Sequence, residues 1–369
     1  MILRNSHRLV LEMRKPDGRP LGQFPLKGDW EPAFEWTRFS ALRRFPIAAI
    51  GMDAIAEIRP VWDTLRGQPY VGTFEIALTV PGKGQVVSRV PTRYFKDQAR
   101  AASAPLVQRG QLKAGEAFDY LIAAFPDDQP KPALARARFE IEEVPVPLSL
   151  KESHLIGFEA RSTACGPQHE QDIRIFIPQT VLEEVDALTR AAEAVEAAAV
   201  LIGYHHRDRV SGDLFLEITA QIPARHSLAS SVKVQFTPDT WTAVQRLIDL
   251  RRSQEQMVGW FHSHPARHWC NAQCPAEARQ RCALQRTFFS ADDCDVHRTV
   301  FSKASNVALL VTDTDAGLEH AAFAWRDGMI EQRGFHIIQN STHPHPVPAA
   351  TPAAAAIIGE PEHEKDCPD

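Results

Sequence analysis

Apolar residues in the second half of the chain recur with the periods of strands and helices. Residues 173–177 alternate like a half-buried strand, and Pro178 begins a helix whose apolar positions continue from Val181 to Val195. The same patterns predict further strands at 200–203, 214–218, 257–261 and 307–311, and a second helix at 241–251. Near the end, Asp327-Gly328 is a hairpin-turn signal. We expect a mixed α/β sheet flanked by helices.

The first 147 residues carry a weaker pattern. Residues 70–80, in which β-branched and aromatic residues dominate, have a clear strand pattern, and residues 117–125 are another strand candidate. They predict a smaller α+β or β-rich domain. Tryptophans in a small domain are usually core residues, with a protein-binding face as the alternative. The three concerned are Trp30, Trp36 and Trp62.

Composition divides the 369 residues into four parts. Residues 1–147 and 172–338 are each long enough to bury a core. A proline-interrupted connector, 148–171, is predicted between them. The tail 339–369 has too little apolar content to pack, so disorder is expected there.

Charge and hydropathy exclude several classes of function. The net charge of -5 and the 24% of charged residues indicate no nucleic-acid partner. No apolar run reaches the length that crosses a membrane, and the first residues lack a secretory apolar core. We expect a cytoplasmic protein, in which cysteines are free or bound to metal.

A group of potential metal ligands follows the strand predicted at 257–261. His262 and His264 are separated by one residue, so in an extended segment their side chains point to the same side. Pro265 has no N–H to donate and should end the strand. A catalytic zinc takes three imidazole or carboxylate ligands and leaves its fourth position to water. A His-x-His pair alone is weak evidence, because many such histidines are ordinary hydrogen-bonded residues.

Two further segments supply carboxylates. Ser290 has the character of a helix cap, and Asp292 and Asp293 fall in the first turn of that helix, so either could turn back to a metal. Upstream, Glu193 and Glu196 lie in an alanine-rich stretch that is predicted to be helical, where glutamate is a normal surface residue.

These residues resemble the JAMM metalloproteases, also called MPN or JAB domains. The pattern of that family is Glu, then His-x-His-Pro, then Ser-x-x-Asp, and the chain has the same order. The resemblance implies that His262, His264 and Asp293 bind zinc, that Glu196 is the general base and acid, and that Ser290 helps to hold the oxyanion. It favours Asp293 over Asp292, and Glu196 over Glu193 because the family has Glu-x₆-Gly. It also implies a JAB/MPN fold, a cytidine-deaminase-like mixed sheet, for residues 172–338.

The resemblance also implies an activity. JAMM enzymes hydrolyse the isopeptide or peptide bond after the C-terminus of ubiquitin or a ubiquitin-like protein, with a zinc-bound water as the nucleophile. We therefore expect a bacterial deconjugating or precursor-processing peptidase. Its partners would be a ubiquitin-like protein or its conjugate and conjugation enzymes from the same operon, as in bacterial antiphage systems. The N-terminal domain would recognise the modifier or its target. Two alternatives remain open: a non-catalytic MPN scaffold, and a zinc hydrolase of small amide substrates.

One departure from the family is an insertion at 266–289, between Pro265 and Ser290. Thiolates favour zinc in a tetrahedral cage, so a second, structural zinc site is one interpretation of the cysteines in and just after this insertion. Those cysteines are Cys270, Cys274, Cys282 and Cys294. His268 or His297 could replace one of them. The alternative is reduced free thiols or a single disulfide.

Overall fold

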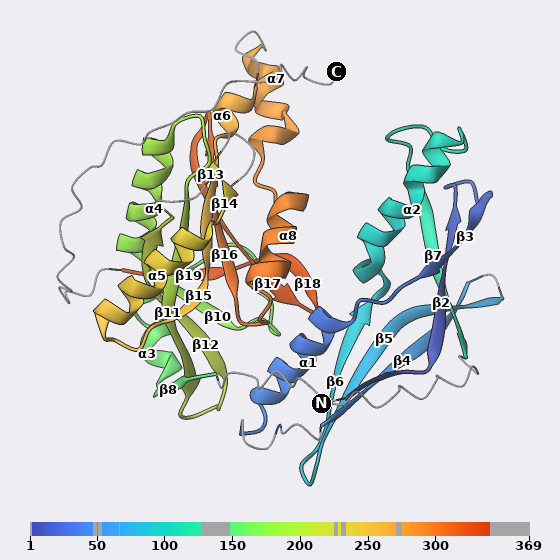
Figure 1. Cartoon of the computed structure of the whole chain (residues 1–369), viewed down its shortest axis with the longest axis horizontal. Helices are drawn as coiled ribbons and strands as arrows, with labels where there is room; N and C mark the ends of the chain where they lie inside the picture. The colour runs from blue at the N-terminus through green and yellow to red at the C-terminus, as the bar shows by residue number, and fades with distance from the viewer. Residues whose placement is uncertain are drawn as a thin grey trace. The chain divides into compact units, whose positions relative to one another are not determined.

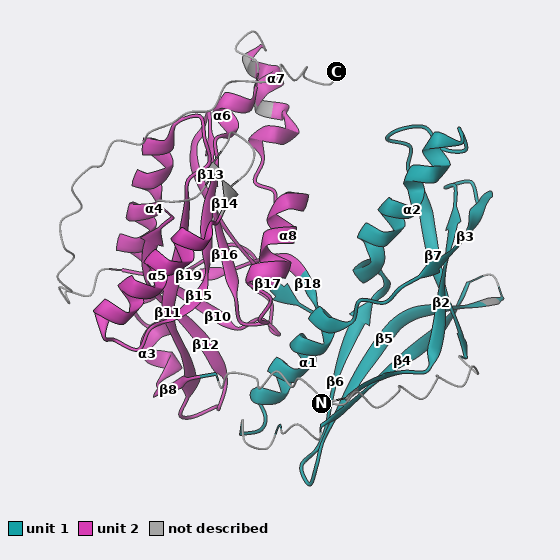
Figure 2. Ribbon diagram, in the orientation of Figure 1, with its two compact units in different colours: residues 1–148, 325–329 teal, residues 149–324, 330–369 magenta. Residues whose placement is uncertain are grey.

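A computed structural model describes residues 2–46, 50, 54–65, 67–126, 148–224, 228–229, 234–270 and 275–339 (Figure 1). The chain forms two compact units (Figure 2). Unit 1 comprises Met1–Leu148 with Trp325–Met329, and unit 2 comprises Ser149–Ala324 with Ile330–Asp369. Both combine sheets with helices, which confirms the general α/β class.

Unit 1 contains two antiparallel-rich sheets and two main helices. One sheet has the order β1(Ile2–Asn5), β4(Ile55–Leu65), β5(Gln68–Val80), β6(Gly84–Pro91), and the other β3(Pro20–Leu26), β2(His7–Arg14), β7(Asp119–Pro126). The helices are α1(Glu31–Leu42) and α2(Lys96–Gln108), the latter preceded by the 3₁₀ turn η2(Thr92–Phe95). The strands predicted at 70–80 and 117–125 are β5 and β7.

The tryptophans of unit 1 divide between core and surface. Trp30 packs against the rings of Phe74 and Phe95, at centroid distances of 5.0 and 5.3 Å. Trp36 is also buried, whereas Trp62 on β4 is 48% exposed. The core interpretation is therefore confirmed for Trp30 and Trp36 and wrong for Trp62.

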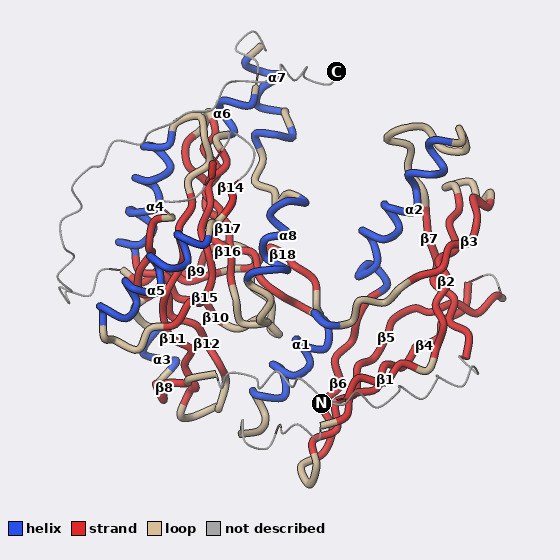
Figure 3. The backbone as a smooth tube through the Cα atoms, in the orientation of Figure 1, coloured by secondary structure: helices blue, strands red, loops and turns tan. Residues whose placement is uncertain are grey.

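Unit 2 is built around a long sheet, whose strands Figure 3 shows in red. Among the described residues ten strands join it, with β8 paired to β11 off the main path. The order is β18(Met329–Arg333), β17(Gly317–Arg326), β16(Val307–Thr314), β15(Gln256–His264), β11(Ala198–Asp208), β12(Leu214–Pro223), β10(Arg174–Pro178), β19(Phe335–Ile338), β9(Ser162–Cys165), with β8(Leu150–Ser153) at the side. A two-stranded pair, β13(Leu228–Ala229) and β14(Val234–Gln235), stands apart from it.

Two helices of unit 2 begin where the sequence predicts them: Pro178 precedes α4(Gln179–Ala192), and Ser290 caps α8(Ala291–Val300). The helix predicted at 241–251 begins earlier, as α5(Pro238–Arg251) with Thr237 as its cap. The shorter elements are α3(Leu155–Glu159), α6(Ala266–Trp269), α7(Ala276–Arg281) and η3(Ala283–Gln285).

Opposite faces of the sheet carry different helices. The rings of Trp241 on α5 and Phe301, which follows α8, have centroids 6.1 Å apart. Both pack on the face of the sheet where Trp260 and Ala321 lie. On α4, Asp186 bonds at 2.7 Å to His320, the neighbour of Ala321. Since side chains alternate along a strand, α4 lies on the other face.

Of the predicted connector 148–171, residues 149–171 belong to unit 2. Its strand β8 pairs in parallel with β11, and β9 pairs with β19. These pairings join residues far apart in sequence, so local composition did not reveal them. Of the predicted disordered tail, residues 340–369 lie outside the described part of the chain. No helix within the described ranges is long and apolar enough to span a membrane.

Candidate metal centre

Strand β15 brings two histidines to the interior of unit 2. It lies between β11 and β16, so both of its edges are hydrogen-bonded. His262 and His264 are 0% and 1% exposed at its C-terminal end, with their rings 5.0 Å apart. The predicted common orientation of the pair is confirmed.

Helix α8 places a carboxylate against both rings. Asp293 Oδ1 lies 3.1 Å from His262 Nε2, and Asp293 Oδ2 lies 3.3 Å from His264 Nε2. The helix N-terminus fixes this carboxylate, because Ser290 N–H donates to Asp293 Oδ2 at 2.7 Å and Asp293 N–H donates to Ser290 Oγ at 3.1 Å. Asp292 is exposed, so the carboxylate of the cluster is that of Asp293.

The donor atoms of this cluster fit a metal ion. One ligand atom from each of the three residues lies within 4.8 Å of the others. Two ligand atoms each about 2.0 Å from a tetrahedral zinc are about 3.3 Å apart, close to the two imidazole–carboxylate distances. Both nitrogens of His262 and Nδ1 of His264 are buried without a hydrogen-bond partner in the described part of the chain. Such groups are costly in a protein interior, and a cation held by the two Nε2 atoms and Asp293 would satisfy Nε2 of His262.

The protonation states also suit metal binding. Burial alone would raise the pKa of Asp293, but the charges and close contacts of His262 and His264 outweigh it and hold that pKa below its usual range. Burial lowers the pKa of His264. At neutral pH the carboxylate is ionised and the His264 imidazole is neutral, and these are the forms that coordinate a metal.

Glu196 reaches the same site from the loop just before β11. Ala197 N–H donates to Ser263 Oγ at 2.9 Å, and Ser263 N–H donates to Ala197 O at 3.0 Å. The register pairs Ala198 with His262, so Glu196 stands opposite His264 and faces the same side. Its side chain is 4% exposed. Burial, then the charges of Asp293 and Asp292, raises the pKa of Glu196 to about 8.

The surroundings of Glu196 differ from the helix predicted for them. Helix α4 ends at Ala192, and Glu193 has a positive φ of 53°. Glu196 therefore lies in the short loop that enters β11. The ordinary-surface interpretation is therefore wrong for the buried Glu196, whereas the neighbouring Glu193 is exposed.

Aromatic side chains that the sequence did not single out surround the two histidines. Trp260 stacks on His262 at 4.4 Å with an interplanar angle of 12°. Trp269 and Phe288, both from the insertion, lie 5.0 and 5.1 Å from the His264 ring. One of these contacts could have been predicted from the sequence: Trp260 is two residues before His262 and so lies on the same side of the strand.

The cysteines of the insertion form no complete metal cage among the described residues. Cys270 is buried and accepts from Gln285 Nε2 at 3.6 Å, and Cys282 lies beside it. Cys274 falls outside the described residues, so the four-thiolate site with Cys294 stays a prediction. The suggested substitute His297 is fully buried and its Nδ1 accepts from Trp260 Nε1–H; its replacement of a cysteine stays a prediction.

Polar contacts attach the insertion to the end of β16. Arg267 pairs with Asp313, and Arg279 pairs with Asp315 at 2.7 Å. Gln285 Nε2 donates to Ala266 O at 2.7 Å. These contacts place α6, with Trp269, beside His264.

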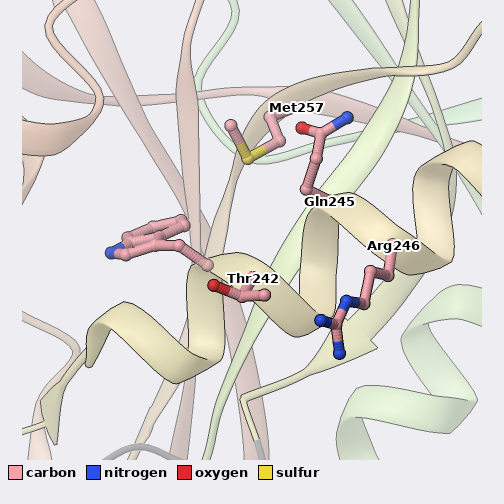
Figure 4. Close-up of a pocket in the computed structure, with 5 residues that line it drawn as sticks. Thr242, Gln245, Arg246 and Met257 are labelled. Atoms are coloured by element: carbon pink, nitrogen blue, oxygen red, sulfur yellow. The ribbon is translucent and has the colours of Figure 1, made fainter.

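A separate pocket of about 490 Å³ lies on α5 and the beginning of β15 (Figure 4). Its lining includes Thr242, Gln245, Arg246 and Met257. Met257 begins the strand whose other end carries the histidines. The pocket is therefore distinct from the metal centre.

Comparison with known proteins adds little to this geometry. No family model matches the chain, and no curated protein matches it. Among solved structures, the solution structure of protein DSY2949 from Desulfitobacterium hafniense is similar at 22% identity. The match covers 46% of this chain and 99% of that one, with a TM-score of 0.31. No conclusion about fold or function follows from a score this low.

Proposed function

We propose that this protein is a zinc-dependent peptidase of the JAMM type, with a JAB/MPN domain at 172–338. The observation that carries the proposal is the convergence of His262 and His264 with Asp293, from two segments whose order in the sequence is that of the JAMM pattern. Buried Glu196 beside them completes the pattern. Zinc bound there would polarise a carbonyl group and lower the pKa of water.

Glu196 is suited to move the proton. A general base works best when its pKa is near the operating pH, and that of Glu196 is raised to about 8 by burial and by Asp293 and Asp292. A cation held by the three ligands would oppose the effect of those carboxylates and favour the ionised form. Glu196 would accept a proton from water and deliver it to the leaving amine.

Ser290 is suited to stabilise the developing oxyanion. Its oxygen accepts from Asp293 N–H and its own N–H donates to Asp293, which leaves the hydroxyl proton for a substrate oxygen. The same contacts hold Asp293 in place. Capping and oxyanion stabilisation are therefore compatible roles.

The substrate class comes from the sequence resemblance. We propose the amide bond after the C-terminus of a ubiquitin-like protein, with unit 1 recognising the modifier or its target. The test uses zinc-loaded protein and ubiquitin joined through its C-terminus to the lysine of a fluorescent peptide. Release of the peptide by wild type and Glu193→Gln, but not by Glu196→Gln, is the expected result.

Two other outcomes would replace the proposal. No hydrolysis of any amide by the zinc-loaded protein would favour the non-catalytic scaffold, and equal non-zero activity of Glu196→Gln and wild type would remove Glu196 as the general base. Cleavage of small acyl-amino-acid amides without cleavage of the ubiquitin probe would favour a small-substrate hydrolase.

A further inference from the structure

A buried hydrogen bond connects the strand that carries the histidines to the helix that carries Asp293. Trp260 Nε1–H donates to His297 Nδ1 at 3.1 Å. Trp260 is 1% exposed and His297 is 0% exposed. Because Nδ1 accepts this bond, the neutral His297 ring carries its proton on Nε2.

Both partners stand next to metal ligands. Trp260 precedes His262 by two residues on β15 and stacks on its ring at 4.4 Å. His297 follows Asp293 by four residues on α8, so the two lie on one face of the helix. Phe301, four residues further, stacks on Trp260 at 5.9 Å. The helix face that supplies the carboxylate is thus also the face that contacts the strand.

The ligand His262 lacks the usual means of orientation. Metal-binding histidines normally donate their second nitrogen to a carboxylate, carbonyl or water, which fixes the ring. His262 Nδ1 has no hydrogen-bond partner in the described part of the chain. Its ring is instead covered by Trp260 on one side, with Phe289 at 5.7 Å.

We propose that Trp260 and His297 are positioning residues of the metal centre. Stacking by Trp260 orients the His262 ring, and the Trp260–His297 hydrogen bond fixes α8 on β15 so that Asp293 stays over the two histidines. The inference rests on the proposed metal site. It assigns to a stacked, hydrogen-bonded tryptophan the role that a hydrogen bond to His262 Nδ1 would otherwise have.

The test measures metal affinity in Trp260→Phe, His297→Phe and the double variant, by competition for Zn²⁺ with a chromophoric chelator. Phenylalanine keeps a ring at position 260 but removes the donor, and at position 297 it removes the acceptor. Each single variant should bind zinc about 10-fold more weakly, as variants of outer-shell residues generally do. The double variant should be no weaker than the worse single variant, because both variants break the same bond.

Two further variants separate positioning from simple core packing. His297→Gln offers a side-chain oxygen to the indole N–H and should recover affinity to within a few-fold of wild type. Trp241→Phe, in the same aromatic cluster, should leave affinity unchanged. The visible spectrum of the Co²⁺-substituted protein, which reports ligand geometry, should change in Trp260→Phe and not in Trp241→Phe.

The outcomes are distinguishable. Lower thermal stability of Trp260→Phe and His297→Phe, with wild-type zinc affinity and an unchanged Co²⁺ spectrum, would show a structural role and overturn the inference. Failure of the wild-type protein to bind Zn²⁺ or Co²⁺ would overturn the proposed function as well.

Discussion

Buried histidines lie at two places on the sheet of unit 2: His206 at one, His262 and His264 at the other. The two places differ in whether protein atoms form hydrogen bonds with the ring nitrogens. His206 is bonded at both, by Ser153 Oγ at 2.7 Å from Nδ1 and by Glu217 Oε2 at 3.0 Å from Nε2. His262 and His264 are at least as buried, yet three of their four nitrogens have no hydrogen-bond partner in the described part of the chain. The first group is a complete structural network, whereas the second has the features of a ligand site.

A fourth buried histidine, His205, shows that unpaired nitrogens are not sufficient evidence for a metal site. Both nitrogens of His205 also lack a hydrogen-bond partner in the described ranges. Burial, then His206, lowers its pKa to about 4, so it stays neutral. It belongs to no metal-sized group of the described residues. Unpaired nitrogens alone therefore do not indicate a metal; their convergence on Asp293 does.

The largest expected effect is on catalysis. Glu196→Gln removes the proposed general base and should lower kcat by about 10²- to 10⁴-fold. Zinc content should stay at the wild-type value, because Glu196 is not a ligand. The exposed Glu193→Gln is the matched control. A parallel loss in both variants would contradict the assignment of Glu196.

The second effect is the stabilisation by metal. Zinc at 100 to 1,000 times its Kd should raise the free energy of unfolding by about 2.7 to 4.1 kcal/mol over the metal-free protein. The shift should disappear in His264→Ala and persist in His206→Ala, as measured by thermal unfolding with and without a chelator. A shift that survives in His264→Ala would locate the ion elsewhere.

The third effect is on the stability of the metal-free protein, to which His206 should contribute more than His264. In metal-free protein, His206→Ala should lower the free energy of unfolding by about 2 to 3 kcal/mol, because it leaves Ser153 and Glu217 unpaired and removes a ring stacked on Phe215 at 4.7 Å. His264→Ala should lower it by less, about 1 to 2 kcal/mol, because it removes a buried ring but only one polar contact, that with Asp293. Denaturant titration of both variants measures the difference. Equal losses would remove the distinction between the groups.

The fourth effect concerns Glu255, whose carboxylate accepts several hydrogen bonds and has a lowered pKa, in contrast to the raised pKa of Glu196. Burial would raise the pKa of Glu255, but hydrogen bonds from Arg251, Ser253 and Thr219 outweigh it and lower that pKa from 4.5 to about 2. The resulting stability is present above pH 4.5 and is lost as the pH falls through about 2. Glu255→Gln should therefore cost about 2 kcal/mol at pH 7 and progressively less below pH 4.5.

Unfolding of Glu255→Gln and wild type across this pH range measures the effect. The exposed Glu152→Gln should show almost no difference at any pH. A difference for Glu255→Gln that is constant with pH would mean that the network does not depend on its ionised form.

Local features of the site could be predicted from the sequence because each depends on a few neighbouring residues. Alternation along an extended strand put His262 and His264 on one side, and the cap at Ser290 put Asp293 in the first helical turn. The hairpin turn at Asp327 and Gly328 also formed, with both residues at positive φ.

Long-range features could not be predicted in this way. The burial of Glu196 depends on the pairing of Ala197 with Ser263, 66 residues away. The strand predicted to close at Gly203 continues to Asp208. A Cβ added at Gly203 would lie 1.9 Å from the backbone oxygen of Glu217 on the neighbouring strand β12, so the glycine is required by a long-range contact. The bond between Trp260 and His297 likewise crosses from strand to helix.

Zinc per chain, measured by elemental mass spectrometry on untagged wild type, His264→Ala and His206→Ala, tests the central claim most directly. We predict about one equivalent more zinc in wild type and His206→Ala than in His264→Ala. Any zinc that remains in His264→Ala would be bound by the cysteines. Equal zinc in wild type and His264→Ala, or another metal in place of zinc, would contradict the account.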